Sequence, residues 1–318
     1  MKILVTGAAG FIGSHLCEFL WEGGHDLVAL DNFNDYYDPR IKRHNVEKLH
    51  RRPRYELVEG DILDEKLLAT IFQKHAFEAI IHLAARAGVR PSIGQPVLYE
   101  KVNVLGTVKL LEQARLHRVP KFIFGSSSSV YGENKKVPFS EVDSVDNPIS
   151  PYAATKKSGE LTCYTYHHLY GIAVSCLRFF TVYGPRQRPD MAIHKFTSLI
   201  ATSQKVPMYG DGTSKRDYTF ITDIIDGISR ALERCTSYHI YNLGESKTIE
   251  LRELIKLIQK DLGIEAKIER LPLQLGDVPI TFADISCARA ELGYNPQVTI
   301  ETGIQRFIEW FKDVHKLK

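Results

Sequence analysis

Two tyrosines in the 318-residue sequence are each followed, four residues later, by a lysine, and such a pair can transfer protons. Tyr131 opens a turn-like Gly-Glu-Asn stretch, in which a spacing of four does not align side chains. Tyr152 instead follows Ser150 and Pro151, a helix cap and a first-turn proline, so Tyr152 and Lys156 are predicted to share one helix face. A neighbouring ammonium favours ionisation of a phenol, whose ordinary pKa is about 10. Tyr152 is therefore the candidate proton acceptor, with Lys156 as its partner.

Four consecutive serines, residues 126–129, end a strand-like segment that begins at Lys121. The carboxyl ends of strands line the crevice in which open α/β sheets bind ligands. A serine hydroxyl there is predicted to reach the same substrate oxygen as Tyr152. For any one of the serines, a turn or helix cap is the alternative interpretation.

A glycine-rich loop follows the first predicted strand. Gly7 suits a tight turn, Gly10 lets backbone N–H groups approach a pyrophosphate, and Gly13 allows close packing of helix on strand. The next predicted strand ends at Asp31, where a carboxylate can accept both hydroxyls of the adenosine ribose and repel a 2′-phosphate. The pattern predicts NAD rather than NADP; a glycine-rich turn of an unrelated α/β protein is the alternative.

A third strand is followed by Asp61 and Ile62. Two interpretations are equally open for Asp61, namely contact with the adenine of the cofactor and a helix cap.

Short segments rich in β-branched residues alternate with amphipathic stretches along the first 180 residues. They are Lys2–Thr6, Asp26–Leu30, Tyr55–Val58, Ala79–Leu83, Lys121–Gly125 and Ala173–Arg178. Strands this far apart need crossover connections, which predicts an α/β fold with a Rossmann-type doubly wound parallel sheet. Helical patterns return at Leu251–Leu262 and Ile300–Val314. We expect an NAD-binding domain over residues 1–180, with part of 215–245 packing back on it, and a smaller C-terminal α/β substrate domain over 181–318.

Composition argues against several classes of protein. The 41 basic and 38 acidic residues give a net charge of +3, so no global field would recruit nucleic acid or an anionic membrane. The five cysteines include no close pair, which argues against a metal site and favours reduced, buried thiols. The chain enters its first predicted strand at Ile3 and has no apolar run near the roughly 18 residues of a membrane span. We expect no signal peptide, no membrane segment and a cytoplasmic location.

Essentially the whole chain resembles the extended short-chain dehydrogenase/reductases, and within them the nucleotide-sugar 4-epimerases. The matching segments are Gly7-x-x-Gly10-x-x-Gly13, Asp31, His82-Leu83-Ala84-Ala85, Asn103, the serine-rich strand before Val130-Tyr131-Gly132, Tyr152-x-x-x-Lys156 and Arg216-Asp217-Tyr218. The resemblance implies a tightly bound, recycled NAD, a UDP-sugar substrate and a homodimer paired through the helices that include the Tyr-Lys segment. It puts the catalytic hydroxyl on Ser127. Besides the residues already named for NAD, we expect cofactor contacts at Phe11, Ile12, Asn32, Ile62, Leu83, Ala84, Ala85 and Asn103.

Three further segments resemble UDP-glucuronate 4-epimerases rather than UDP-glucose 4-epimerases: Asp31–Pro39, Gly184–Ala192 and Gly276–Pro279. Thr181 stands where the UDP-glucose enzymes usually carry an asparagine that contacts the hexose, and Gln274 where they often place an arginine. The resemblance implies Arg216 on the pyrophosphate and Tyr209 or its neighbours beside the uracil. We also expect substrate contacts at Ser128, Ser129, Thr181, Arg188 and Asp277. Two alternatives stay open: Arg216 is merely solvated, or Arg188 only pairs with Asp190 at the surface.

The implied reaction is the 4-epimerisation of UDP-glucuronate to UDP-galacturonate. Tyr152 takes the proton of the sugar 4-hydroxyl, Ser127 relays or orients it, and hydride moves from C4 to NAD and returns to the opposite face of a 4-keto sugar. That ketone lies β to the C6 carboxylate, and such acids lose carbon dioxide readily. We expect Thr181, Ser128, Ser129 and Arg188 to hold the carboxylate out of alignment with the carbonyl.

Other activities remain alternatives: a UDP-glucose or UDP-N-acetylhexosamine 4-epimerase, or a UDP-glucuronate decarboxylase. A 4,6-dehydratase usually carries an acidic pair just after its catalytic hydroxyl, and here those positions are Ser128 and Ser129. The non-enzyme alternative is a catalytically silent NAD-binding regulator, because a fold does not fix a function. The presence of Ser127, Tyr152 and Lys156 argues against it.

Overall fold

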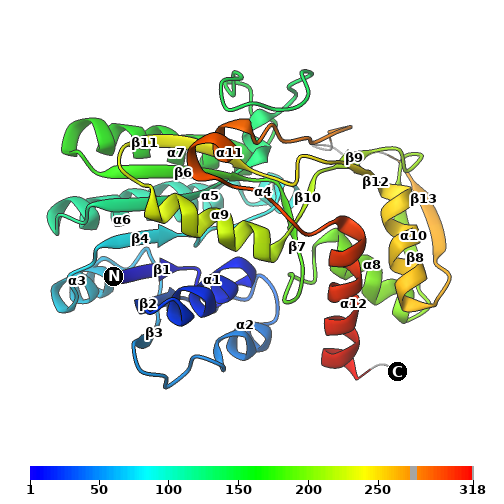
Figure 1. Cartoon of the computed structure of the whole chain (residues 1–318), viewed down its shortest axis with the longest axis horizontal. Helices are drawn as coiled ribbons and strands as arrows, with labels where there is room; N and C mark the ends of the chain where they lie inside the picture. The colour runs from blue at the N-terminus through cyan, green and yellow to red at the C-terminus, as the bar shows by residue number, and fades with distance from the viewer. Residues whose placement is uncertain (273–277, 317–318) are drawn as a thin grey trace.

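A seven-stranded parallel sheet forms the centre of the protein (Figure 1). The structure is a computed structural model that describes residues 1–272 and 278–316. In spatial order the strands are β11 (Tyr238–Leu243), β6 (Ala173–Phe179), β5 (Lys121–Ser127), β4 (Ala79–His82), β1 (Lys2–Thr6), β2 (Asp26–Asp31) and β3 (Tyr55–Glu59). Every neighbouring pair is parallel, which confirms the predicted doubly wound sheet. The order reverses between β1 and β4, the point at which such sheets bind ligands.

Helices cover both faces of the sheet, because alternate side chains of each strand point to opposite faces. In β1, Ile3 and Val5 pack in one core cluster with Leu16 of one helix layer, whereas Leu4 packs with Leu110 of the other. The first layer holds α1 (Phe11–Glu22), α9 (Ile221–Glu233) and α11 (Ser286–Leu292), and the second holds α3 (Glu65–Lys74), α6 (Gly106–Leu116) and α7 (Pro151–Tyr170). The short elements α2 (Pro39–Val46), α4 (Val89–Gly94), α5 (Pro96–Tyr99), the π-helical η1 (Glu100–Leu105) and the 3₁₀-helical η2 (Ser128–Tyr131) lie in the connections.

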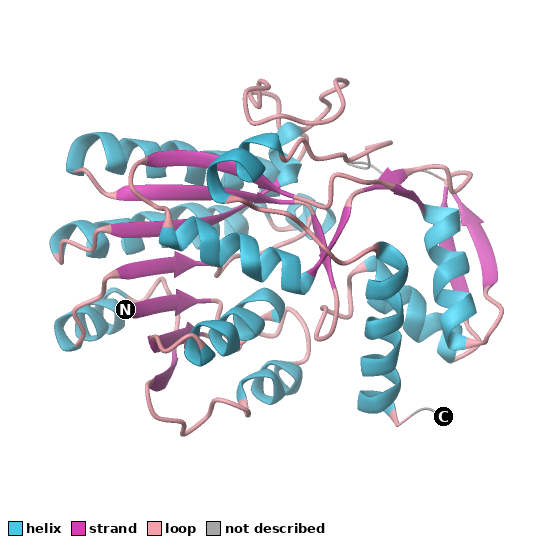
Figure 2. Ribbon diagram, in the orientation of Figure 1, coloured by secondary structure: helices cyan, strands magenta, loops and turns pink. Residues whose placement is uncertain are grey.

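A smaller group of elements lies beyond the carboxyl ends of the sheet strands (Figure 2). It contains α8 (Ala192–Ala201), α10 (Leu251–Leu262) and α12 (Ile300–His315), and three two-stranded sheets: β8 (Lys205–Tyr209) with β13 (Lys267–Leu271), β7 (Thr181–Tyr183) with β10 (Tyr218–Phe220), and β9 (Lys215–Arg216) with β12 (Ile249–Glu250). The helix predicted at Leu251–Leu262 is confirmed, and the last predicted helix extends one residue further. Within the described ranges, no helix is long and apolar enough to cross a membrane.

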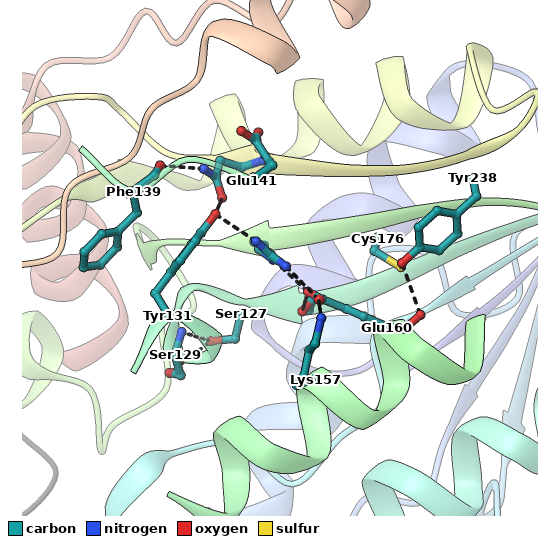
Figure 3. Close-up of polar contacts among 12 residues, drawn as sticks. Ser127, Ser129, Tyr131, Phe139, Glu141, Lys157, Glu160, Cys176 and Tyr238 are labelled. Carbon is teal, nitrogen blue, oxygen red and sulfur yellow. Dashed lines mark hydrogen bonds and ion pairs between the residues drawn. The ribbon is translucent and has the colours of Figure 1, made fainter. Parts of the chain in front are cut away.

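A buried ion pair ties α7 to β6 (Figure 3). Arg178 donates from Nε and Nη2 to the two carboxylate oxygens of Glu160, each at 2.9 Å, and both side chains are 1% exposed. Arg178 Nη1 donates to the hydroxyl of Tyr131 at 3.0 Å, and that hydroxyl donates to Asn242 of β11 at 2.7 Å. Tyr131 therefore holds sheet strands together, in agreement with the expectation that the Tyr152 pair, and not this one, is positioned for chemistry.

Candidate active site

A cavity of about 980 Å³ opens at the carboxyl ends of the sheet strands, where the sheet faces the smaller group of elements. Most of the residues predicted for a site line this cavity. They are Gly7, Gly10, Phe11, Ile12, Gly13, Asp31, Asn32, Asp61, Ile62, Leu83, Ala84, Ala85, Ser127, Ser128, Ser129, Tyr152, Lys156, Thr181, Arg188 and Arg216. The topology thus brings residues that are about two hundred positions apart in the sequence to one cavity.

The glycine loop has no room for side chains. At Gly7, with a φ of +70°, a Cβ would lie 2.7 Å from the backbone N of Ala84, and at Gly13 a Cβ would lie 2.1 Å from the Gly7 carbonyl oxygen. Gly10 is the N-cap of α1 and supplies no side-chain hydrogen bond to the first turn. The first N–H groups of α1 therefore remain available to an anionic ligand in the cavity.

Asp31 is fixed by two backbone donors. Its Oδ2 accepts from Ala9 N at 3.1 Å and its Oδ1 from Phe33 N at 2.9 Å. The buried ammonium of Lys42 lies 3.9 Å from Oδ1 and donates to Asn34 Oδ1 at 3.2 Å. Each carboxylate oxygen keeps acceptor capacity for a ribose hydroxyl.

Asp61 does not cap the following helix. Asp64 is the N-cap of α3, and its carboxylate accepts from the N–H groups of Lys66 and Leu67. Asp61 instead accepts from Asn32 Nδ2 at 2.8 Å on the cavity wall. The helix-cap alternative was therefore wrong, and the adenine-contact interpretation stays a prediction.

His82, the last residue of β4, is buried between two threonine hydroxyls. Its two ring nitrogens lie 2.8 Å from the hydroxyl of Thr6 and 3.0 Å from that of Thr107. Burial lowers the pKa of His82 to about 3, with a smaller contribution from the charge of Lys156, so the ring is neutral at working pH. The Thr6 hydroxyl in turn accepts from Ala84 N at 3.2 Å, which fixes the backbone of a predicted cofactor residue.

Asn103 lies behind the cavity wall rather than on it. Its side chain accepts from Arg86 N at 2.8 Å and donates to Arg86 O and to Thr155 Oγ1, each at 3.0 Å. These bonds tie the loop after β4 to α7 beside Tyr152. Asn103 is thus placed to act through its neighbours.

The first two turns of α7 present the two predicted catalytic side chains, Tyr152 and Lys156. Ser150 caps the helix by accepting from Ala153 N at 3.1 Å, as its sequence position predicts. Lys156 Nζ is buried and donates to the Gly125 carbonyl at 2.6 Å. Burial lowers the pKa of this ammonium to about 8.

Burial raises the pKa of Tyr152, while a hydrogen bond with Ser127 and the charge of Arg188 act in the opposite direction. From the sequence we expected the Lys156 ammonium to favour the phenolate form of Tyr152. In the structure, Lys156 Nζ is 6.0 Å from the Tyr152 ring centre, and burial dominates. The nearby cation that lowers this pKa is instead Arg188.

Within the serine run, Ser126 and Ser127 have different hydrogen-bond partners. Ser126 donates to the buried carboxylate of Glu160 at 2.7 Å. Ser127 accepts from Ser129 N and donates to Ser129 Oγ, each at 3.2 Å (Figure 3), so it caps η2 while it also lines the cavity. For Ser127 the capping and cavity-facing interpretations therefore both hold.

The lining of the same cavity also includes residues expected to contact a sugar nucleotide. Arg188 and Asp190 form a two-bond ion pair, with side chains 20% and 42% exposed, and both line the cavity. Thr181 of β7 is the strand-register partner of Tyr218 of β10. One residue, Asp217, separates Tyr218 from Arg216. Asp217 is buried and accepts from the backbone N–H groups of three residues at 2.8–3.1 Å. Burial raises its pKa to about 6.

One predicted substrate residue, Tyr209, does not line the described cavity. The Tyr209 ring lies 4.9 Å from the guanidinium of Arg90. Asp277 lies outside the described residues.

Several lining residues were missed by the sequence argument: Tyr36, Lys42, Arg86, Arg90 and Asp190. The first four follow the carboxyl ends of β2 and β4. Because such loops form the ligand crevice, their position after the strands was the available signal. Among the described residues, no group of three or more His, Cys, Asp or Glu side chains is arranged to hold a metal.

Known proteins match the chain over almost its whole length. Residues 4–307 match the family described as GDP-mannose 4,6 dehydratase. A UDP-glucuronate 4-epimerase of Thermodesulfobacterium geofontis is 43% identical over 311 residues, which are 98% of this chain and 96% of that protein. The crystal structure of UDP-glucuronic acid 4-epimerase from Bacillus cereus, in complex with UDP-glucuronic acid and NAD, is 37% identical, with a TM-score of 0.93 over 99% of this chain and 100% of that one.

A dehydratase has a similar fold. DesIV, a dTDP-glucose 4,6-dehydratase from Streptomyces venezuelae, is 31% identical and also reaches a TM-score of 0.93, over 99% of this chain and 98% of that one. Fold similarity alone thus does not separate the two reactions, and the residues of the site must do so. With these matches spanning its length, the chain belongs to the GDP-mannose 4,6-dehydratase family, together with the UDP-glucuronate 4-epimerases that it resembles.

Proposed function

We propose that the chain is an NAD-dependent UDP-glucuronate 4-epimerase, which interconverts UDP-glucuronate and UDP-galacturonate through a transient 4-keto sugar. The observation that carries this proposal is the shared cavity, which Ser127, Tyr152, Thr181 and Arg188 all line. The 43% identity to a UDP-glucuronate 4-epimerase over nearly the full chain supports the substrate.

The walls of the cavity fit a dinucleotide. We propose that the glycine loop and the first N–H groups of α1 hold the pyrophosphate, and that Asp31 accepts the hydroxyls of the adenosine ribose. The other proposed contacts are Phe11, Ile12, Asn32, Asp61, Ile62, Leu83, Ala84 and Ala85, all of which line the same cavity. When bound, NAD supplies the means to remove hydride from C4 of the sugar and to return it.

Side chains of the protein accept and return the proton of the sugar 4-hydroxyl. We propose that Tyr152 takes the proton of the 4-hydroxyl, with Ser127 hydrogen-bonded to the phenol to orient it. Lys156 carries its charge below a pKa of about 8 and lies one helical turn from Tyr152. Arg188 supplies the positive charge that lowers the pKa of the Tyr152 phenol.

The same cavity offers groups that are suited to hold the C6 carboxylate. Arg188 offers a charged guanidinium, and Thr181, Ser128 and Ser129 offer hydroxyls. Held out of alignment with the C4 carbonyl, the carboxylate is retained when the ketone forms. Ser128 and Ser129 also leave no carboxyl group directly after Ser127, which disfavours a 4,6-dehydratase.

We further propose that residues 1–180, with α9 and β11, act as the NAD-binding domain and the remainder as the substrate domain. In support of a homodimer, α7 exposes Leu161, Tyr164 and Leu169. Light scattering tests the dimer: Leu161→Glu should give monomers, whereas Val142→Glu, at an equally apolar but isolated surface position, should not. The buried thiols suit the cytoplasm, which cell fractionation tests.

The proposed reaction is tested by incubating purified protein with UDP-glucuronate, without added NAD, and resolving the sugars by NMR. An equilibrium mixture with UDP-galacturonate and little carbon dioxide is the expected result. Pentose formation would instead indicate a decarboxylase. Turnover of UDP-glucose but not of UDP-glucuronate would refute the substrate assignment.

A further inference from the structure

Asp190 occupies one edge of the Arg188 guanidinium. Arg188 Nε donates to Oδ1 and Nη2 to Oδ2 of Asp190, each at 2.9 Å. A guanidinium has a second edge, formed by Nη1 and Nη2, that can also bind a carboxylate in two-bond fashion. Within the described residues, Nη1 makes no hydrogen bond, so this second edge is the one left for a substrate.

The face of the same guanidinium lies against a tyrosine. The Arg188 Cζ atom is 5.3 Å from the centre of the Tyr36 ring, and the Tyr36 hydroxyl donates to the Ala87 carbonyl at 2.9 Å. A ring anchored in this way attracts the cation but does not fix its rotation in the plane. The two bonds to Asp190 do fix that rotation.

The backbone on either side of Arg188 is held independently of this pair. Gln187 is buried, donates to Val182 O at 3.1 Å and accepts from His194 N at 3.1 Å. One residue earlier, Arg186 forms an ion pair with Glu18 of α1 at 2.7 Å. With the loop anchored at these points, loss of the Asp190 carboxylate should release the Arg188 side chain but not the loop.

We propose that Asp190 is a positioning residue that turns the Nη1–Nη2 edge of Arg188 toward the C6 carboxylate of the sugar nucleotide. This rests on the proposed function. Without Asp190, the guanidinium rotates and the carboxylate is held less firmly. In the 4-keto sugar the C5–C6 bond can then align with the carbonyl and break; carbon dioxide leaves, the electron pair forms an enolate with the C4 ketone, and C5 takes up a proton.

The test compares Asp190→Asn with a matched control, Asp226→Asn. Asp226 is 41% exposed, accepts from Arg230 Nε at 2.7 Å and lies outside the cavity. With Asp190→Asn we expect the ratio of pentose to UDP-galacturonate to rise at least about threefold, since a single charged hydrogen-bond pair is lost. Asp226→Asn should leave the ratio unchanged, and melting temperature and NAD content should show that both variants fold.

A second measurement asks whether Asp190 acts through Arg188. Affinities for UDP-glucuronate and UDP-glucose are measured by calorimetry in the Tyr152→Phe background, which lacks the proton acceptor. We expect Asp190→Asn to weaken UDP-glucuronate about fivefold or more and UDP-glucose less than about twofold. Once Arg188→Gln is present, adding Asp190→Asn should change the affinities very little, because residues acting as one unit are not additive.

Three outcomes would overturn the proposal. Additive effects of the two substitutions would mean that Asp190 acts on its own. Tighter binding of UDP-glucuronate to Asp190→Asn would make Asp190 a competitor of the substrate carboxylate. If Asp190→Asn leaves the ratio of the affinities for UDP-glucuronate and UDP-glucose unchanged, Asp190 has no role in binding the carboxylate. If the wild-type protein fails to convert UDP-glucuronate, the proposed reaction fails, but the affinities still decide the role of Asp190.

Discussion

Two arginine–carboxylate pairs have the same bond geometry in different surroundings. Arg178 binds Glu160, and Arg188 binds Asp190, in both cases through Nε and Nη2 at 2.9 Å. The first pair is sealed between α7 and β6, with both side chains 1% exposed. The second lines the cavity, with exposed fractions of 20% and 42%.

The third nitrogen of each arginine explains the difference. Arg178 Nη1 donates to the Tyr131 hydroxyl, so the buried guanidinium is fully enclosed by protein partners. Arg188 Nη1 donates to no residue that the structure describes. A closed pair holds structure together, and an open pair can take a ligand; the chemistry of the two groups is the same.

The largest expected effect on stability follows from removing the arginine of the buried Arg178–Glu160 pair. Arg178→Met removes the two-bond partner of the buried Glu160 carboxylate and leaves it only the Lys157 ammonium at 3.8 Å, which should lower the free energy of unfolding by about 3 kcal/mol. Urea unfolding followed by circular dichroism measures this. A loss below about 1 kcal/mol, as expected for an exposed arginine such as Arg230, would contradict the importance of enclosure.

Lys156 extends the comparison, because it is buried and forms no ion pair with a carboxylate of the described residues. Its folded pKa of about 8 lies below the unfolded value of about 10.4, so between these values the unfolded chain binds the extra proton. Stability of the wild type should therefore rise with pH across this window, by up to about 1.4 kcal/mol per unit relative to Lys156→Met. Urea unfolding of both proteins at pH 8 and pH 10 checks the difference. Parallel pH dependences would show that the ammonium keeps its ordinary pKa.

Opening the cavity pair should affect binding rather than folding. Arg188→Gln removes a charged hydrogen-bond donor from the C6 carboxylate, at a cost of about 1.5–3 kcal/mol, or roughly 10- to 100-fold in affinity for UDP-glucuronate. Affinity for UDP-glucose, which lacks the carboxylate, should change little. Calorimetry with both nucleotides measures the two effects, and equal losses for both would argue against a carboxylate contact.

The smallest effect is expected for the exposed pair on α9. Asp226→Asn breaks a contact between partly exposed side chains spaced four residues apart, which should change the free energy of unfolding by less than about 0.5 kcal/mol. Urea unfolding provides the test. A loss comparable to that of Arg178→Met would remove burial as the cause of the difference between the pairs.

Local patterns predicted the elements that carry the chemistry. Ser150 and Pro151 marked the start of α7, and the glycine spacing marked the turn before α1, because both signals depend only on neighbouring residues. Asp190 was considered in the sequence only as a surface partner of Arg188. Its place on the cavity wall depends on the fold of the whole loop, which no local pattern contains.

Contacts between residues that are far apart in the sequence could not be predicted from the sequence either. Lys42 approaches Asp31 because α2 returns across the end of β2, and Asn103 meets Thr155 because η1 packs on α7. Tyr131 shows the reverse: its turn-like surroundings correctly separated it from Tyr152, but its bonds to Arg178 and Asn242 join three distant segments. Tertiary packing, and not spacing, determined these contacts.

The position of β11 has a consequence for the order in which the protein is made. The last strand of the central sheet comes from residues 238–243, whereas the strand beside it, β6, ends at Phe179. During synthesis one edge of β6 therefore has no hydrogen-bonded partner strand until about sixty more residues have left the ribosome. The Tyr131 hydroxyl likewise meets Asn242 only at that stage. A nascent chain that stops before residue 243 exposes a sticky strand edge, so premature termination in this stretch should produce aggregates rather than a smaller folded protein.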